Sequence, residues 1–159
     1  PAGLRLVNAD VLARELDLDA YAAARAADAL RQALVKRKES FVFETVFSDP
    51  AGEKLAFLKH AASSGYTVIL LFIGLASPDI SEERVAMRVT QGGHDVPSDK
   101  LRSRFPRTLA NLRAAIRELP HVLVFDNSDL NRPFRRVAEF ENGRCVGRLD
   151  VPRWLLALL

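Results

Sequence analysis

The sequence has little of what marks a secreted, membrane-spanning or metal-cluster protein. Its 159 residues include one cysteine, Cys145, which excludes an internal disulfide and any metal site built from several cysteines. No apolar run reaches the roughly 18 residues of a membrane span. The stretch after Pro1 also lacks the basic and then apolar pattern of a signal peptide. We therefore expect a soluble, cytoplasmic protein with no membrane partner.

Repeats, low-complexity tracts and long linkers are absent as well. With 48% hydrophobic residues, the chain is long enough to enclose a sizeable core, so we expect a single domain over residues 1–159. His60, His94 and His121 show no metal-ligand spacing. They predict no metal site.

Four short apolar runs predict β-strands, at residues 4–7, 40–43, 66–73 and 121–125. The runs are apolar on both faces, which is typical of parallel strands covered by helices on each side. Stretches with helical composition separate them, and we expect helices at residues 19–38, 49–64 and 81–91 and over the basic segment that follows. The predicted fold class is α/β, with a parallel sheet flanked by helices.

The last part of the chain has a different pattern. Residues 134–140 and 144–149 are joined through Asn142-Gly143, a dipeptide that favours the type I′ turn of a β-hairpin. A short apolar helix over residues 151–159 is expected after the hairpin. Trp154 then packs on the body of the protein, or its apolar surface meets a partner.

Two carboxylates follow two of the predicted strands directly. Asp10 comes after the first strand and Glu44 after the second, and ligands of open parallel sheets bind outside the carboxyl ends of the strands. Such a pair can divide acid, base and hydroxyl-orienting roles, with the hydroxyls of Thr45 and Ser48 beside it. The alternative for Asp10 is the N-cap of a helix over residues 11–16.

A basic segment with an internal glycine pair comes next. Arg84 and Arg88 lie four residues apart on one predicted helical face, where an anion would relieve their repulsion. The alternative is that they are solvated or form surface ion pairs. Gly92-Gly93 then permits an abrupt reversal of the backbone.

After the reversal, Arg102 and Arg104 stand on a second predicted helix, which we expect Pro106 to break or kink. From Arg88 to Arg107 there are five Lys or Arg and two Asp, an excess equal to the formal net charge of +3. Two arginine-bearing helices joined by a glycine turn predict a lid. The planar guanidinium suits phosphate oxygens and can offset charge that develops in phosphoryl transfer.

Together these stretches resemble zeta-toxin-like kinases, above all the bacterial relatives labelled predicted ABC-type ATPases. The resemblance covers residues 4 to about 128 and is most specific in the Arg-rich segment with Gly-Gly-His. The matching stretches are Val7-Asn8-Ala9-Asp10, Phe43-Glu44-Thr45, Arg84 to Pro97, Arg104-Phe105-Pro106-Arg107 and Asp126-Asn127-Ser128.

The resemblance implies a P-loop NTPase-like fold and an ATP-dependent kinase, with Mg²⁺ bound together with the nucleotide. It implies Asp10 as the base for a substrate hydroxyl, and Glu44 and Thr45 as residues that hold the substrate. The nearby hydroxyl of Ser48 is a further candidate for substrate binding. It implies phosphate contacts from the lid, with Arg88 as the first lid arginine and Arg104 as the second. The remaining candidates for phosphate or ATP contact are Arg84, Arg102, which rivals Arg104, and Asn127, whose stretch is equally typical of an ordinary turn.

One expected motif is missing. Proteins of this kind carry a strand and a G-x-x-x-x-G-K-[ST] loop ahead of the segment that begins here, and no such loop occurs in the sequence. Without its backbone cradle, its lysine and its hydroxyl for magnesium, we expect the chain to be inactive by itself. We expect it to be part of a longer protein, and the alternative is a degenerate domain that has lost the loop and retains only substrate or partner binding.

The resemblance also implies a small-molecule acceptor, such as the nucleotide sugar UDP-N-acetylglucosamine, and an antitoxin protein as partner. The competing function is a non-catalytic module that binds phosphate or nucleic acid through the basic lid. Nucleic acid is disfavoured, because the arginines are not interleaved with exposed aromatics and carboxylates near the site would repel a polyanion.

Overall fold

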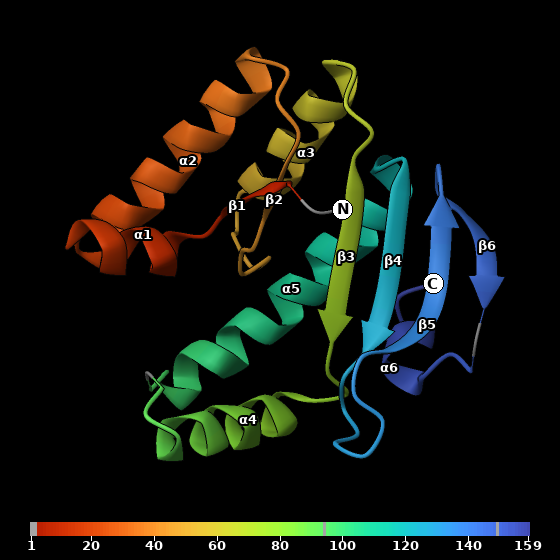
Figure 1. The fold of residues 1–159 in the computed structure, drawn as a ribbon. Coiled ribbons are helices and arrows are strands. Elements are labelled where there is room, and N and C mark those ends of the chain that lie inside the picture. The colour runs from red at the N-terminus through yellow and green to blue at the C-terminus, as the bar shows by residue number, and fades with distance from the viewer. Residues whose placement is uncertain (1–2, 94, 149) are drawn as a thin grey trace. The chain divides into compact units, whose positions relative to one another are not determined.

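The computed structural model describes residues 3–93, 95–148 and 150–159. The chain divides into two compact units, Pro1–Val46 and Phe47–Leu159, so the prediction of one domain stays a prediction. Each unit combines helices with parallel strands (Figure 1). The α/β, P-loop NTPase-like class predicted from the sequence is confirmed.

In the first unit, two short parallel strands pack with two helices. The elements are β1 (Arg5–Val7), α1 (Ala9–Leu16), α2 (Ala20–Lys36) and β2 (Phe41–Phe43). Val7 pairs with Phe43 in the parallel register, and Val7, Ala27 and Leu34 form a buried cluster between strand and helix. Helix α2 begins at Ala20 because the Asp19 side chain accepts hydrogen bonds from the amides of its first turn.

Helix α1 begins two residues earlier than the sequence suggested. Its N-cap is Asn8, whose Oδ1 accepts from the amides of Asp10 at 2.8 Å and Val11 at 3.2 Å. Interpreting Asp10 as the cap is therefore wrong. Asn and Asp are equally good caps, and the helix starts directly after β1, so Asn8 takes the position and Asp10 falls inside the first turn.

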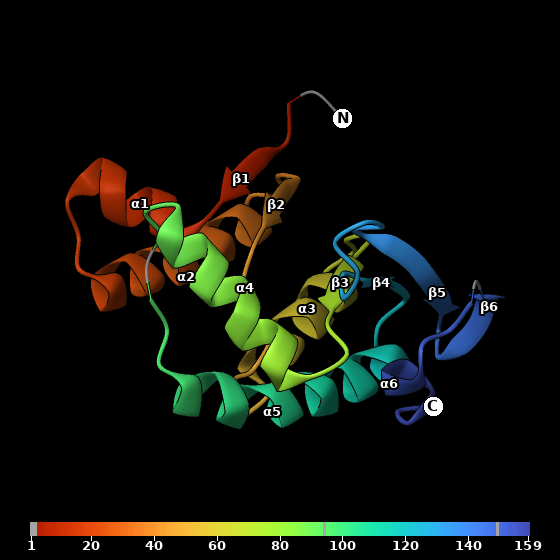
Figure 2. The ribbon, with the colours of Figure 1, turned by 90° about the horizontal axis from the view of Figure 1, so that it is seen from below.

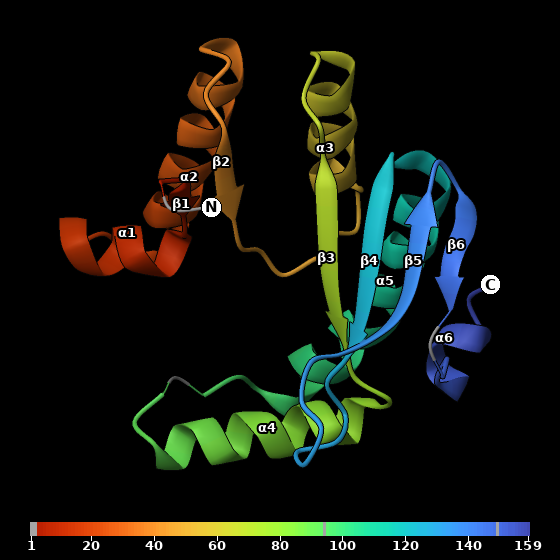
Figure 3. The same cartoon turned by 45° about the vertical axis from the view of Figure 1, so that its right-hand side comes forward.

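The second unit contains a mixed four-stranded sheet in the order β3-β4-β5-β6. Strands β3 and β4 are parallel, whereas β5 and β6 form an antiparallel hairpin on β4 (Figure 3). The helices are α3 (Glu53–Ser63), α4 (Pro78–Thr90), α5 (Ser98–Glu118) and α6 (Arg153–Leu156). The strands are β3 (Ile69–Gly74), β4 (His121–Asp126), β5 (Arg135–Glu141) and β6 (Arg144–Arg148).

Helices α3 and α5 cover one face of this sheet (Figures 1 and 3). Leu112 and Ala115 of α5 and Val122 and Val124 of β4 are fully buried. On the other face of β3, alternate side chains are more than half exposed. They are Ile69 at 56%, Leu71 at 60% and Ile73 at 54%. Within this unit, then, helices cover β3 on one face, whereas the sequence predicted cover on both.

The basic helix also differs from its prediction. Helix α5 runs without interruption from Ser98 to Glu118 with Pro106 inside it, so the predicted break is wrong, whereas a kink at Pro106 stays a prediction. Within the described residues, no helix has both the length and the apolar character that crossing a membrane requires.

The C-terminal hairpin was predicted correctly as far as Arg148, since Leu149, the last residue of the predicted strand, is outside the described residues. A helix follows it as predicted but is shorter, Arg153–Leu156 rather than residues 151–159. The hairpin turns at Asn142 and Gly143 with φ values of 48° and 78°, as a type I′ turn requires. Trp154 on α6 is 9% exposed, so it packs on the body of the unit.

Candidate functional site

In the first unit, one side chain links the ends of both strands. The Asn8 amide accepts from the Asp10 backbone amide through Oδ1 and donates from Nδ2 to Glu44 Oε2 at 2.8 Å. Because β1 and β2 are parallel, Asn8 and Glu44 are at the same end of the pair. The structure therefore brings the Asp10 turn and Glu44 to one cluster, and the residue that joins them is Asn8.

The carboxylate of Asp10 is exposed and makes no hydrogen bond or ion pair with any residue that the structure describes. It lies in the first turn of α1, where the helix dipole favours a negative charge. An unpaired carboxylate at that position is available to accept a proton from a ligand hydroxyl. The exposed hydroxyl of Thr45 follows Glu44 directly in the sequence.

Ser48, grouped with these residues in the sequence, belongs to the second unit and is 8% exposed. Its segment is fixed on α5, because Asn111 Nδ2 donates to the carbonyls of Phe47 at 3.2 Å and Asp49 at 3.1 Å. A hydroxyl that is this deeply buried presents little surface to a ligand.

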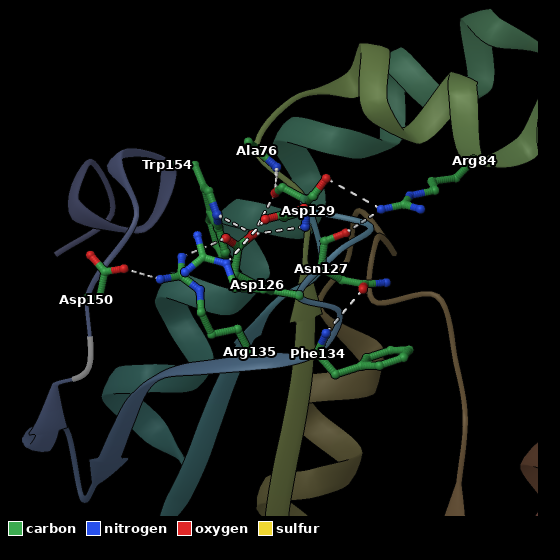
Figure 4. Close-up of polar contacts among 11 residues, drawn as sticks. Ala76, Arg84, Asp126, Asn127, Asp129, Phe134, Arg135, Asp150 and Trp154 are labelled. Carbon is green, nitrogen blue, oxygen red and sulfur yellow. Dashed lines mark hydrogen bonds and ion pairs between the residues drawn. The ribbon is translucent and has the colours of Figure 1, made fainter.

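In the second unit, the candidate lid consists of α4 and α5 with the loop between them (Figure 2). Arg84 lies on α4, and its Nη2 donates to the backbone carbonyls of Asn127 at 3.0 Å and Ser128 at 3.4 Å (Figure 4). These contacts attach the helix to the loop after β4. At least one guanidinium nitrogen of Arg84 is therefore used in a structural hydrogen bond rather than left for a ligand.

Arg88 lies one turn further along α4, and its packing explains the glycine pair. Gly92 has a φ of 86°, and the Gly93 amide donates to the Arg88 carbonyl at 2.9 Å. A Cβ on Gly93 would lie 2.5 Å from Arg88 Cγ. The turn therefore needs glycine at both positions, and Gly93 leaves room for the Arg88 side chain. His94, the next residue of this motif, is outside the described residues.

The two candidates on α5 have different surroundings. Arg102 binds Asp79 Oδ1 at 2.7 Å and Glu82 at 2.8 and 2.9 Å, both on α4. The hydrogen bonds and charges of Glu82 and then Asp79 raise the pKa of Arg102. Arg104 is partly buried, and its side chain has no hydrogen bond or ion pair with a described residue. Arg102 thus joins the lid helices, and Arg104 keeps its donors for a ligand.

Strand β4 ends on a buried acid. Asp126 is 7% exposed and accepts from Ser128, Trp154 and Arg135. Burial alone would raise its pKa, but these hydrogen bonds outweigh it and hold the pKa below its usual range.

The neighbouring candidate, Asn127, fills a structural role in the loop that follows β4. Its backbone amide donates to the Gly74 carbonyl at 2.9 Å, and its backbone carbonyl accepts from Arg84. Its side-chain oxygen accepts from the Phe134 backbone amide at 3.2 Å. These contacts suit the turn that its sequence favours. The side-chain nitrogen is the group of Asn127 that stays open to a ligand.

The sequence assigned no individual role to Asn8, Asp126 or Ser128, although all three stand in stretches that resemble zeta-toxin-like kinases. Asn8 was detectable as a strong capping residue placed directly after a strand. Asp126 was detectable as a charge that ends an apolar strand and must be paired. Nothing in the sequence indicates the contacts of Ser128. Across the described residues, no group of three His, Cys, Asp or Glu side chains is arranged to hold a metal ion.

No curated protein and no solved structure matches the chain. The sequence model of the family described as Zeta toxin matches residues 16–138, which is most of the chain. The matched range includes Glu44, the lid arginines and Asn127, whereas Asp10 precedes it. This chain belongs to the zeta toxin family, whose membership supports a kinase-like, ATP-dependent function in general.

Proposed function

We propose that these residues form the acceptor-binding part and the lid of a kinase that transfers the γ-phosphoryl group of ATP to a small-molecule hydroxyl. Asp10 accepts the proton of that hydroxyl, and Glu44 and Thr45 bind the acceptor. Arg88 and Arg104 contact phosphate oxygens as negative charge develops in the transition state. The observation that carries the proposal is the Asn8 bridge, which groups an unpaired carboxylate with Glu44.

ATP and magnesium fit these residues only in part. The arginines offer planar donors for phosphate oxygens, but the sequence has no G-x-x-x-x-G-K-[ST] cradle, no phosphate-binding lysine within one and no hydroxyl that follows such a lysine. We therefore propose that a phosphate loop outside these 159 residues completes the nucleotide site. Strand β3 is compatible with this, because it is the edge of its sheet and a parallel strand that leads into the loop can pair there.

The acceptor in this proposal is a nucleotide sugar of the UDP-N-acetylglucosamine type, and the place of action is a bacterial cytoplasm. An antitoxin protein is the proposed partner, in keeping with the toxin family to which the chain belongs. Nucleic-acid binding by the lid is less well supported. The guanidinium groups of Arg84 and Arg102 already donate hydrogen bonds to oxygens of the protein. This leaves less cationic surface for the phosphate backbone of a nucleic acid.

The test is a phosphoryl-transfer assay in two chains, residues 1–159 alone and a longer chain in which a phosphate loop precedes them. We expect little transfer from the first, because positioning of the phosphoryl group is most of the catalysis. In the longer chain, Asp10→Asn should lower kcat by about 10²- to 10⁴-fold, since it keeps the shape and removes the base.

Asp17→Asn is the matched control, because Asp17 is an exposed aspartate that follows the last residue of the same helix. Its φ of 51° is tolerated by asparagine, so folding should be unchanged. Equal kcat values for the Asp10→Asn, Asp17→Asn and parent proteins would refute the role of Asp10. Efficient transfer by residues 1–159 alone would refute the need for a separate phosphate loop.

A further inference from the structure

The turn between β3 and α4, where the lid begins, is held by a side chain that follows β4. After β3 ends at Gly74, the chain passes Ala76 and enters α4, whose N-cap is Ser77. The Ala76 amide donates to Ser128 Oγ at 2.8 Å, across 52 positions of the sequence (Figure 4). The first fixed point of the lid is therefore a hydroxyl in the loop after β4.

The orientation of that hydroxyl is set by the buried acid. Ser128 Oγ donates to Asp126 Oδ1 at 2.5 Å, and the Ser128 amide donates to the same oxygen at 3.2 Å. A hydroxyl has one hydrogen to donate and accepts with its lone pairs. Because an ionised carboxylate only accepts, the hydrogen points to Asp126 and a lone pair is left for Ala76.

Two further groups hold the carboxylate itself. Trp154 Nε1 donates to Asp126 Oδ1 at 3.3 Å, and Arg135 Nη2 contacts Oδ2 at 3.2 Å. The indole ring also covers Gly74, since a Cβ built on that glycine would lie 2.3 Å from the ring. Asp126 is thus immobilised from α6 and β5, and the end of β3 is packed under the same ring.

Helix α4 has a second fixed point on the same loop. Arg84 donates to the carbonyls of Asn127 and Ser128, so the helix is attached both before its first turn and near its middle. Two attachments define the direction of a helix, whereas one leaves it free to pivot. Arg88 follows Arg84 by one turn on the same face, so its position depends on both attachments.

We propose that Ser128, oriented by Asp126, is a positioning residue that fixes the root of α4 and, with Arg84, the direction in which the lid presents Arg88. Arg102 extends the effect to α5, because its partners Asp79 and Glu82 lie in the first half of α4. The consequence for phosphoryl transfer rests on the function proposed above. The attachment of α4 does not.

Hydrogen exchange of residues 1–159, followed by mass spectrometry, tests the attachment without any activity. Ser128→Ala removes the hydroxyl and should speed exchange in the peptide over residues 75–84 by about 3- to 10-fold, the effect of losing one net hydrogen bond. Peptides from β4 should change by less than about twofold. Ser128→Thr keeps a hydroxyl and should restore the parent rate.

Ser103→Ala is the control, because among the described residues the Ser103 hydroxyl bonds only within its own helix, to the Lys100 carbonyl at 3.1 Å. If Ser128→Ala does not fold, Arg84→Gln removes the second attachment and should speed exchange in α4 alone. The proposal is overturned by unchanged exchange in α4, by equal acceleration of α4 and β4, or by failure of Ser128→Thr to restore protection.

A kinetic arm uses the longer chain with a phosphate loop. Ser128→Ala should lower kcat by about 10- to 100-fold through misplacement of the lid, with the acceptor KM within about twofold, and Ser128→Thr should recover the rate. An unchanged kcat overturns the positioning role. If the parent chain transfers no phosphate, the proposed function fails, while the exchange rates still decide whether Ser128 fixes α4.

Discussion

At the scale of single residues, Asn8 uses both ends of its amide. The oxygen caps α1 and the nitrogen donates to Glu44, so one side chain sets the start of a helix and the position of a carboxylate on the next strand. Aspartate at this position would keep the cap but place two carboxylates together. Serine would keep the cap and lose the donor.

The two functions of Asn8 can therefore be separated by substitution. Asn8→Ala should lower the free energy of unfolding of the N-terminal unit by about 1 kcal/mol, because the first-turn amides lose their acceptor. Asn8→Ser should recover most of that loss and still leave Glu44 without its donor. Urea unfolding monitored by far-UV circular dichroism measures both, with Asn131→Ala, an exposed loop residue, as control. Equal destabilisation by Ser and Ala would show that the cap is not what Asn8 contributes.

Sequence could predict which residues end the strands but not which arginines are already bonded. Asp10 and Glu44 follow apolar runs, and the edge rule for parallel sheets groups them. Arg84 and Arg102 look like Arg104 in the sequence. Arg84 is bonded to carbonyls more than 40 positions away, and Arg102 to acids on another helix. Only the tertiary fold decides such pairings.

At the scale of elements, α5 shows packing that outweighs a local preference. Proline in a helix interior removes one hydrogen bond and strains the turn before it. Yet Leu112, Ala115 and Ile116 are buried on the face of α5 that meets the sheet, and Pro106 itself is exposed. Before Pro106, Arg102 pairs with Asp79 and Glu82 of α4, so both halves of α5 are held by tertiary contacts and the helix continues through the proline.

Since Pro106 is accommodated at a cost, Pro106→Ala should stabilise the second unit. We expect an increase of about 1 to 3 kcal/mol in the free energy of unfolding, because the helix gains an amide donor and loses a steric conflict. Trp154, the only tryptophan and a buried one, reports the transition by fluorescence in urea. Pro133→Ala in the loop before β5 should give no such gain. No gain from Pro106→Ala would indicate that the helix needs the proline's fixed φ.

The predictability of elements follows the same logic. All four apolar runs became strands, and Asn142-Gly143 formed the expected hairpin turn, because each signal is local. The cover on β3 was not predictable. An apolar run indicates that a strand can be buried on both faces. Which segments cover each face depends on the tertiary fold, and Ile69, Leu71 and Ile73 have no such cover within their unit.

At the scale of the whole molecule, the basic composition has two explanations that differ in their salt dependence. A sequence pI of about 9.4 suits a protein that binds nucleic acid. In a nucleic-acid binder, each Lys or Arg that meets a phosphate adds a similar increment to affinity, and all increments weaken together as salt rises. In a kinase lid, by contrast, two arginines account for most of the effect on phosphoryl transfer, because they bind one small anion.

Substitutions of Arg88 and Arg104 distinguish the two explanations. In the longer chain with a phosphate loop, replacing either with Ala should lower kcat by about 10²- to 10³-fold and change the acceptor KM much less, because the contact forms mainly in the transition state. Lys should rescue poorly, since it keeps the charge and loses the planar pair of donors. Arg113→Ala is the matched control. Arg113 is an exposed arginine on α5, the helix that carries Arg104, and no described residue bonds its side chain.

The same variants are then titrated with a single-stranded oligonucleotide over a salt series. The kinase explanation expects weak binding that the three substitutions barely alter. Tight binding that falls steeply with salt, weakens equally for Arg88→Ala, Arg104→Ala and Arg113→Ala, and accompanies unchanged transfer rates would instead assign the lid to nucleic acid. Because Arg113 lies outside the motifs shared with zeta-toxin-like kinases, its equality with the other two is the decisive observation.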